Sequence, residues 1–472
     1  MAADDQIDLL SIQRGAITAP AGCGKTHLIA DALTRHDNAK PIMILTHTNA
    51  GVVALRGRLD SLRVPSKAYR LVTIDGWAMR LISTFPQRSA HDPGLLNLAH
   101  PATDYPNIRV AAAKLLKAGH ITDVLRASYD RLIVDEYQDC SVRQHALVAC
   151  AAQTLPTVVL GDPLQAIFGF GADNLADWGD VTEYFPIVGQ SNTPWRWINA
   201  GAEPLGRWLL EVREKLLRHE AIDLRQAPAG VTWVELDGSD DHAKRLAAAR
   251  VRVPTRDSCV LIIGDSTNPA SQRQFASQTP GAVTVEAVDL RDLVAFARRF
   301  DLNAPDALDQ LAQFAESVMA NVGATDFVGR VRAISGNARG HADAERVALD
   351  FVRRPNYLGA VDVLVELGKL AGVRTHRPAV FRACIRALQL CHGTEGLSLD
   401  DAAIQMREQN RLVGRPLPRR AVGSTLLLKG LEGDLAVILN ANAMDPRNLY
   451  VAMTRGSKGL TVCSSSPILK PD

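Results

Sequence analysis

Three short apolar runs in the first half of the chain each end at small or acidic residues. LIV at 132–134 is followed directly by Asp135 and Glu136, GAIT at 15–18 leads into APAGCGKT, and VVLG at 158–161 leads into Asp162. Apolar β-forming residues with no polar residue between them are typical of strands buried on both faces of a parallel sheet. The pattern therefore predicts an α/β protein built on such a sheet.

The pattern changes twice farther along the chain. GVTWVEL, SCVLIIGDS and AVTVEAVDL, between residues 230 and 290, are typical of further strands. From about Asp292 to Gln409 apolar residues recur at helical spacing, as in DLVAFARRF and DALDQLAQFAESVMANV. Between residues 81 and 130, AAAKLLKAGHITDVLRASYD predicts one or two helices and little more.

Length and charge narrow the class of protein. At 472 residues the chain is longer than one hydrophobic core usually supports, so about two to four domains are expected. The 53 basic and 51 acidic residues give a net charge of only +2. Any nucleic-acid partner must therefore be met by a local groove rather than by a globally basic surface.

The chain also lacks the marks of membrane, secretory and zinc proteins. No apolar run approaches the ~20 residues of a membrane span, and the acidic start MAADDQIDLL is unlike a signal peptide. We therefore expect a cytoplasmic protein with no membrane partner. Its seven cysteines are scattered, as reduced thiols are. Cys384, Cys391 and His392 have zinc-like residue types, but their helical flanks and the missing second ligand pair disfavour a metal there.

The segment after the first run has the spacing of a phosphate-binding loop. It is the A-x-x-x-x-G-K-T variant, with Ala19 where glycine is usual. In this pattern Gly22 and Gly24 let backbone N–H groups turn toward phosphate oxygens, Lys25 reaches the β- and γ-phosphates, and Thr26 binds Mg²⁺. A chance match in an unrelated α/β protein is the alternative, and the acidic pair on an apolar strand argues against it.

That acidic pair supplies complementary chemistry. At the tip of a buried strand, Asp135 would hold the Mg²⁺ shell and Glu136 would polarise the attacking water, since phosphoryl transfer depends mainly on positioning and charge stabilisation. After the third run come Gln165, which could report on the γ-phosphate, and Phe168 and Phe170. Their rings offer flat faces for nucleic-acid bases, worth ~1–3 kcal/mol per base.

Two segments near the C-terminus complete the pattern. STLLLKGLEG and NLYVAMTRG bring Glu432 and Arg455. An arginine so far along the chain from the phosphate loop suits a second lobe that presents a finger to the γ-phosphate.

Seven segments occur in the order of one protein family. They are ILTHTNAGVVALRGRL, VTIDGWAMRLI, LIVDEYQD, GDPLQAIFGF, NTPWRWIN, LKGLEG and LYVAMTR. From Gly15 to about Val462 the chain thereby resembles the UvrD-like helicases of superfamily 1. The resemblance implies two RecA-like lobes that close on ATP, with single-stranded DNA moving across both in 3′→5′ polarity.

The resemblance also implies roles for individual residues. Trp195 occupies the place of an adenine-stacking tyrosine, and Arg196 and Arg455 those of two arginine fingers beside the catalytic Lys25, Glu136 and Gln165. Nucleotide contacts are implied for Gln6, Gly22, Gly24, Lys25, Thr26, His27, Trp195 and Glu432, with Thr26 and Asp135 on Mg²⁺. DNA contacts are implied for His47, Thr48, Asn49, Arg56, Thr73, Phe168 and Phe170.

The chain departs from the family pattern at several positions. The adenine-reading glutamine lacks its usual context, which leaves Gln6 or Gln13, and Phe170 is followed by glycine instead of the familiar arginine. The residues of the ATP site are kept almost whole, whereas several of those expected to face DNA differ from the family pattern. The replaced positions include His27, His47, Asp75 and Leu426.

The predicted architecture is two RecA-like lobes whose parallel sheets are flanked by helices. A very short helical insertion interrupts the first lobe, and a compact helical insertion interrupts the second. The ranges are 1–80 and 131–189 for the first lobe, 81–130 for its insertion, 190–291 and 410–472 for the second lobe, and 292–409 for its insertion.

The sequence thus favours an ATP-dependent translocase or helicase acting on single-stranded or partly duplex DNA, in repair or in antiviral defence. One alternative is a nucleotide-gated DNA-end-binding subunit that regulates a partner nuclease. Short family members resemble the helicase subunit of Gabija-type antiphage defence, which is an architectural analogy only. A small-molecule kinase is disfavoured because it would leave Arg196, Arg455 and the paired phenylalanines unexplained.

Overall fold

The computed structural model describes residues 7–37, 39–168, 173–253, 255, 257–287, 290–334, 342–412 and 418–471. The chain divides into two compact units. The first comprises Met1–Thr232, Met444–Gly459 and Pro467–Asp472, and the second comprises Trp233–Ala443 and Leu460–Ser466. Gln6 and Phe170, for which the sequence predicts nucleotide and DNA contacts, lie outside the described residues.

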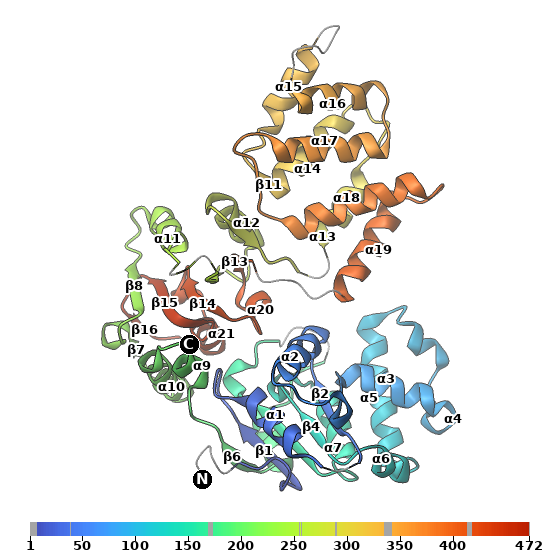
Figure 1. Ribbon diagram of the computed structural model, residues 1–472, viewed down its shortest axis with the longest axis vertical. Coiled ribbons are helices and arrows are strands. Elements are labelled where there is room, and N and C mark those ends of the chain that lie inside the picture. Colours follow the sequence, from blue (N-terminus) through green and yellow to red (C-terminus); the bar gives the residue numbers. More distant parts are fainter. Residues whose placement is uncertain are drawn as a thin grey trace. The chain divides into compact units, whose positions relative to one another are not determined.

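A six-stranded sheet forms the centre of the first unit (Figure 1). Its order is β3-β2-β4-β5-β1-β6, and every neighbouring pair runs parallel. Every residue of β2, β4 and β5 is buried, as their uninterrupted apolar sequences predict. The strands are β1 (Arg14–Thr18), β2 (Ile42–Thr46), β3 (Tyr69–Thr73), β4 (Leu132–Val134), β5 (Thr157–Gly161) and β6 (Ile187–Gln190).

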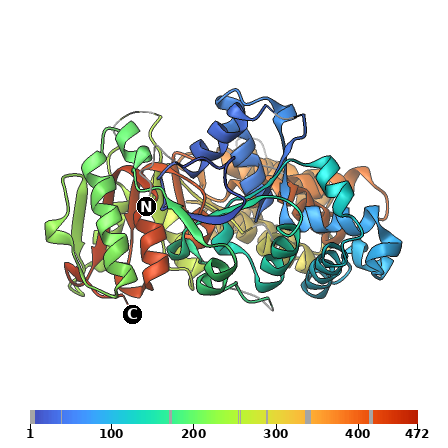
Figure 2. The ribbon, with the colours of Figure 1, turned by 90° about the horizontal axis from the view of Figure 1, so that it is seen from below.

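Helices cover both faces of this sheet. α1 (Lys25–Arg35) and α2 (Asn49–Ser61) pack on one face, and α3 (Ile74–Thr84), α5 (Pro101–Lys117) and α7 (Val142–Ala151) on the other. Figure 2 shows the dark blue helices and the light blue to teal helices on opposite sides of the sheet. The unit also contains α4 (Pro86–Ser89), α6 (Thr122–Ser128), α8 (Trp178–Tyr184), α9 (Trp195–Asn199), α10 (Glu203–Leu217), α21 (Pro446–Met453) and the antiparallel pair β7 (Ile222–Asp223) and β16 (Ile468–Leu469).

The second unit holds another six-stranded sheet, of order β10-β13-β9-β14-β15-β8. Neighbours from β10 to β14 pair in parallel, and α11 (Asp241–Ala249) and α12 (Pro269–Gln278) contribute to its core. The strands are β8 (Val231–Glu235), β9 (Val260–Ile263), β10 (Ala282–Thr284), β13 (Arg420–Gly423), β14 (Gly433–Ile438) and β15 (Gly456–Ser464), with the short α20 (Thr425–Leu428) after β13.

A helical subdomain interrupts the second sheet and has its own apolar core. It comprises α13 (Arg291–Arg299), α14 (Ala307–Val318), α15 (Ala324–Ala333), α16 (Asp343–Arg353), α17 (Tyr357–Lys369), α18 (Pro378–Gly393), α19 (Leu399–Leu412) and the two-residue strands β11 (Met319–Ala320) and β12 (Arg374–Thr375). The predicted fold class is confirmed: two helix-flanked parallel sheets of RecA-like type, with helices in both predicted insertions. Among the described residues, no helix is long and apolar enough to cross a bilayer.

The two compact units group some segments differently from the division expected from the sequence. Residues 190–232 and 444–459 belong to the first compact unit, whereas the sequence-based division assigns them to the second lobe. The reason is local, because Arg213 of α10 bonds Asp162 at the end of β5, and Tyr450 of α21 bonds the backbone N–H of Ala21 after β1. The exact boundaries of the four predicted segments stay a prediction.

A buried ion network fixes the start of α18 to the loop after β10. The Arg377 guanidinium lies 2.5 Å from Glu286 and 2.5 Å from Asp292, and Arg377 is only 2% exposed. We predict that Arg377→Ala destabilises the protein by ~3–5 kcal/mol, because it leaves the buried Glu286 carboxylate without its arginine. Arg298→Ala, which removes an exposed pair with Asp400, should cost less than ~1 kcal/mol. Urea denaturation compares the two, and equal effects would contradict the prediction.

Candidate active site

The loop between β1 and α1 has a backbone that demands its glycines. Gly22 and Gly24 have φ values of +71° and +86°, a region that residues with a Cβ rarely adopt. A Cβ on Gly22 would lie 2.6 Å from Cζ3 of Trp197, and one on Gly24 would lie 3.0 Å from Cδ1 of Trp195. The close approach of these rings leaves no room for a side chain.

The parallel sheet brings three chemically active segments to one edge. β4, β5 and β1 are neighbours, so Asp135, Asp162 and the loop before Lys25 all follow carboxyl ends of adjacent strands. The Lys25 ammonium lies 3.3 Å from Oε1 of Glu136. The structure therefore brings Lys25 to the acidic pair Asp135 and Glu136, which lies 110 residues farther along the chain.

Burial and neighbouring charges shift the pKa values of Asp135 and Lys25. Burial raises the pKa of Asp135 to about 6, with the Glu136 carboxylate adding to the rise and Lys25 opposing it. Burial lowers the pKa of Lys25, but neighbouring carboxylates outweigh this and hold that pKa above its ordinary value. Those carboxylates are Glu136, Asp135 and Asp162. The lysine therefore stays charged and is held toward an acidic edge.

The orientation of Glu136 is set by its backbone and by one amide. Glu136 has φ +54°, a strained value for a residue with a side chain. Nε2 of Gln138, in the short helix η4 (Tyr137–Asp139), donates to Oε2 of Glu136 at 2.5 Å. Oε1 of Gln138 accepts from the backbone N–H of Asp162 at 3.1 Å. Gln138 thereby connects the ends of β4 and β5.

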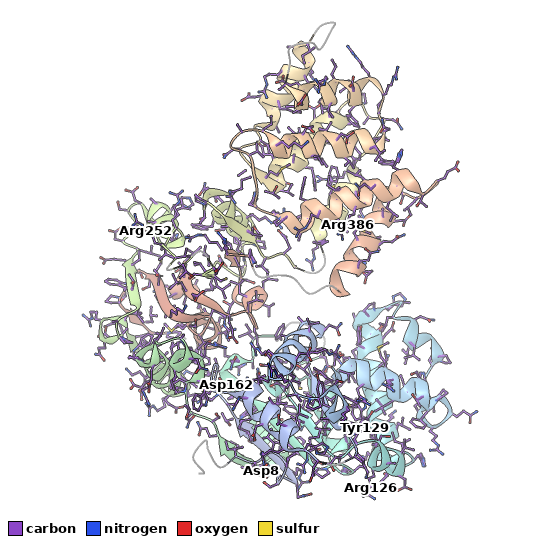
Figure 3. The ribbon with its side chains drawn as sticks, viewed as in Figure 1. Asp8, Arg126, Tyr129, Asp162, Arg252 and Arg386 are labelled. Atoms are coloured by element: carbon purple, nitrogen blue, oxygen red, sulfur yellow. The ribbon has the colours of Figure 1, made fainter. Side chains whose placement is uncertain are left out.

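Asp162 is the centre of a second set of bonds. It is fully buried, and its Oδ1 accepts from Nε and Nη2 of Arg213 at 3.2 and 3.1 Å. Its Oδ2 accepts from Nε2 of Gln165 at 3.1 Å; Gln165 ends the short helix η5 (Pro163–Gln165). Figure 3 labels Asp162 within the first unit. The position of Gln165 thus depends on an arginine of α10.

Two aromatic residues attach the phosphate loop to neighbouring segments. The Tyr450 hydroxyl of α21 accepts from the backbone N–H of Ala21 at 3.2 Å, and burial raises the pKa of that hydroxyl. Nε1 of Trp197 donates to the backbone oxygen of Gly456 at 2.9 Å. α9, α21 and the phosphate loop therefore form one packed assembly.

Both predicted arginine fingers lie in the same unit as Lys25. The backbone N–H of Arg196 donates to Gly22 at 3.1 Å, and its Nη1 donates to the backbone oxygen of Thr454 at 2.7 Å. Arg455 is 3% exposed, and its Nε donates to the backbone oxygen of Val451 at 2.8 Å. The structure brings both arginines to the end of α21.

Of the other residues predicted to contact nucleotide, two lie beside the phosphate loop and one belongs to the second unit. Trp195 is 42% exposed and lies beside Gly24. His27 is exposed in the first turn of α1. Glu432 belongs to the second unit.

Residues predicted to contact DNA cluster at the carboxyl ends of β2 and β3. Thr48 and Thr73 are N-caps whose hydroxyls accept from the backbone N–H groups of Gly51 and Gly76. The His47 and Phe168 rings lie 5.5 Å apart. Asn49 is exposed in the first turn of α2, and Arg56 lies farther along that helix. Capping gives the two threonines a structural role, and their DNA contacts stay a prediction.

The oxygen ligands available at this edge fit Mg²⁺. Asp135 offers a carboxylate and Thr26 a hydroxyl, which is hydrogen-bonded at 3.2 Å by Nη1 of Arg58. A Mg²⁺ ion typically takes one or two such protein oxygens together with substrate phosphates and water. Across the described ranges no cluster of three or more His, Cys, Asp or Glu residues could hold a metal ion by itself.

Sequence reasoning missed two positioning residues, Gln138 and Arg213. A signal for Arg213 exists, because it lies on α10 among the buried residues Leu209, Val212 and Leu216. An arginine within an apolar stripe needs a buried partner. No comparable signal marks Gln138, whose partners follow two different strands.

A phosphate loop on β1, an acidic pair after β4 and a polar loop after β5 define a P-loop NTPase with RecA-like topology. Residues 96–176, which include Asp135, Glu136 and Gln165, match the model of the UvrD/REP helicase N-terminal domain. Residues 96–176 are therefore similar to the N-terminal domain of UvrD/REP helicases, as the resemblance of the motifs predicts.

Two curated relatives are both described as the A component of an ATP-dependent helicase/nuclease. They come from Lacticaseibacillus casei (strain BL23) and Lacticaseibacillus paracasei (strain ATCC 334), and each is 39% identical to this chain over 80 residues. The similarity covers 15% of this chain and 6% of each relative. It is therefore a similarity of one segment.

We predict that the phosphate loop tolerates no Cβ at Gly22. Gly22→Ala should destabilise the nucleotide-free protein by ~2 kcal/mol or more, because both backbone strain and overlap with Trp197 oppose it. Gly57→Ala is the matched control, since this helical glycine has nothing within 4 Å of its added Cβ. It should stabilise by ~0.5–1 kcal/mol. Thermal unfolding measures both, and a neutral Gly22→Ala would contradict the proposed fit.

Proposed function

We propose that this protein is an ATP-dependent motor that moves 3′→5′ along single-stranded DNA and separates duplex DNA in its path. The assembly of Lys25, Asp135 and Glu136 at one edge of a parallel sheet carries the proposal. The match of residues 96–176 to the UvrD/REP helicase N-terminal domain supports it, because members of that family are ATP-dependent DNA helicases. We place its action on DNA in the cytoplasm.

Hydrolysis would use groups that are already close together. The N–H groups of the phosphate loop and Lys25 bind the phosphates at the positive end of α1. Glu136, held by Gln138, orients and polarises the attacking water. Asp135 and Thr26 would hold Mg²⁺, which supplies charge neutralisation to the phosphates when bound. Arg196 and Arg455 add positive charge as the γ-phosphate leaves.

Movement requires that the nucleotide be connected to the DNA. Gln165 and Phe168 are three positions apart, and Gln165 is bonded to Asp162. A change at the γ-phosphate that displaces Gln165 would therefore also displace the ring of Phe168, on which a base can stack. Such coupling converts a chemical step into a step along the strand.

A second candidate is a nucleotide-gated subunit that binds DNA ends and regulates a nuclease. The changed DNA-facing positions, such as His47, favour it, as does the helicase/nuclease description of the two relatives. A motor and a switch share the ATP site. They differ in whether hydrolysis produces directional movement.

ATP hydrolysis should depend on Glu136, whereas ATP binding should not. Glu136→Gln should lower ATP turnover by ~10²-fold or more, because the neutral amide polarises water poorly. A labelled nucleotide should still bind. Lys25→Ala should lose both ATP turnover and nucleotide binding, because it removes the positive charge that faces the phosphates. Glu211→Gln, at an exposed position on α10, is the control and should keep normal turnover. Normal turnover in Glu136→Gln would exclude the proposed role.

Directional movement separates the motor from the switch. On DNA carrying streptavidin at one end, the wild-type protein should displace the block at the 5′ end and leave a 3′ block in place. Phe168→Ala should lose both DNA-stimulated turnover and displacement, while the DNA-independent ATPase persists, because base stacking of ~1–3 kcal/mol is removed. If the wild type hydrolyses ATP on DNA but displaces neither block, the switch is favoured. Full activity in Phe168→Ala would place the DNA elsewhere.

A further inference from the structure

The first sheet ends at a strand whose outer edge is open. β3 pairs with β2 in parallel from Tyr69 to Thr73, and no strand in the described part of the chain pairs with its other side. An edge strand presents unpaired backbone N–H and C=O groups, which can template pairing with another chain. Proteins commonly cover or shorten such edges.

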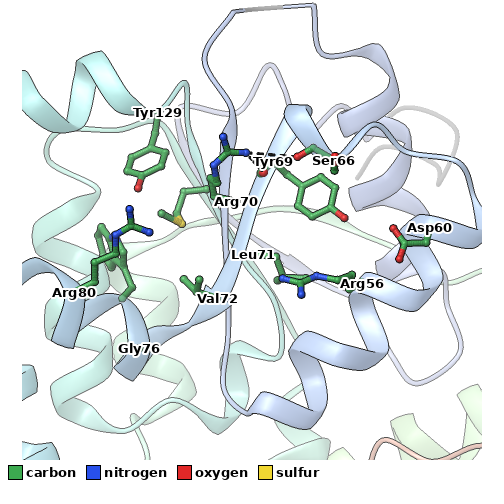
Figure 4. A pocket seen from close by; sticks show the side chains of 12 residues that line it. Arg56, Asp60, Ser66, Tyr69, Arg70, Leu71, Val72, Gly76, Arg80 and Tyr129 are labelled. Atoms are coloured by element: carbon green, nitrogen blue, oxygen red, sulfur yellow. Dashed lines mark hydrogen bonds between the residues drawn. The ribbon is translucent and has the colours of Figure 1, made fainter. Parts of the chain in front are cut away.

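A cavity of about 300 Å³ follows this edge and reaches both faces of the sheet. Figure 4 shows Arg80 and Tyr129 on one side of β3, and Arg56 and Asp60 on the other. Successive side chains of a strand point to opposite faces. Space on both sides of an open edge is what the alternating side chains of an added strand require.

The strand's own residues mark the two faces of that space. Tyr69 and Leu71 belong to the core beneath α2, whereas Val72 packs against the core beneath α3. Trp77 and Met43 line the cavity on the α3 side. The floor on each face is therefore apolar and already packed, and it needs no rearrangement to receive small apolar side chains.

The charge of the cavity selects the occupant. Arg56, Arg70 and Arg80 line it, and Asp60 is the only acidic residue among its lining residues. All three arginines are exposed, and within the described residues none lies in salt-bridge distance of a carboxylate. Nη1 of Arg70 folds back onto the backbone oxygen of Tyr69 at 2.9 Å.

We propose that the open edge of β3 binds an extended acidic segment of a partner protein, which pairs with β3 as an added strand. Backbone hydrogen bonds to β3 supply affinity, and acidic side chains that meet Arg70 and Arg80 supply specificity. A polynucleotide has no alternating N–H and C=O groups with which to continue the sheet. The cavity extends along β3 from Ser66, before its amino end, to Gly76, just after its carboxyl end.

The test uses a defined probe in place of the unidentified partner. A capped, fluorescent peptide of alternating valine and glutamate should bind the full chain, as measured by anisotropy. A valine–lysine peptide of equal length tests charge. A valine–glutamate peptide N-methylated at alternate residues tests strand pairing, because it keeps the charge and loses backbone donors. Hydrogen exchange of Tyr69–Thr73 should slow only with the peptide that binds as a strand.

Charge reversal identifies the site. Arg70→Glu/Arg80→Glu should weaken binding of the valine–glutamate peptide by ~10-fold or more, because like charges would then face one another. Arg126→Glu, an exposed arginine of α6 (Figure 3), is the matched control and should bind within about twofold of the wild type.

Four outcomes would overturn the proposal. They are failure of the valine–glutamate peptide to bind, equal binding of the lysine or N-methylated peptide, unchanged binding by the charge-reversed variant, and unchanged exchange at β3. If the same variant instead loses binding to a fluorescent oligothymidine while peptide binding is unchanged, the edge serves DNA.

Discussion

The buried ion pair between Asp162 and Arg213 is the interaction on which the rest of the site depends. Asp162 is fully buried, and an isolated carboxylate there would be very costly without a cation and hydrogen bonds. Arg213 supplies the cation through two hydrogen bonds. Because Arg213 belongs to α10, satisfying one charge at the end of β5 also fixes that helix against the first sheet.

Several bonds follow from this anchor. Asp162 holds Gln165, and its backbone N–H reaches Gln138, which in turn bonds Glu136. α10 packs on α21, whose Tyr450 bonds the phosphate loop at Ala21. Glu136 and Gln165 are thus held through one connected set of polar contacts, and the packing of α10 on α21 joins the phosphate loop to it. In a low-dielectric interior such a network is stable only when each member is satisfied, which favours a single arrangement of the site.

Local patterns predicted much of this structure, because they act over a few residues. The uninterrupted run at 132–134 could only be a buried strand, and the left-handed backbone at Gly22 and Gly24 follows from the loop pattern. Arg213 and Gln138 could not be assigned, because their partners follow strands that adjoin only in the folded sheet. Residues 190–232 group with the first unit through contacts of the same kind, such as the bond between Arg213 of α10 and Asp162, which motif order does not reveal.

Asp75 is one of the positions at which the DNA-facing segments differ from the family pattern, and its carboxylate is held by ion pairs. Asp75 stands where a histidine is common in the family, yet it is held by two 2.7 Å bonds from Nε and Nη2 of Arg109. Nη1 of Arg109 also bonds Asp173 at 2.7 Å, and Asp173 accepts from Ser141 as well. The carboxylate at position 75 is therefore paired with an arginine that also secures residue 173.

The contacts of Asp173 also affect the segment that carries Phe168. Asp173 lies five positions after Phe168, and the familiar arginine after Phe170 is absent. A network from α3, α5 and the start of α7 therefore secures residue 173, which follows that segment in the chain. The carboxylate at position 75 therefore has a structural partner of its own, and its presence does not show that DNA binding has been lost.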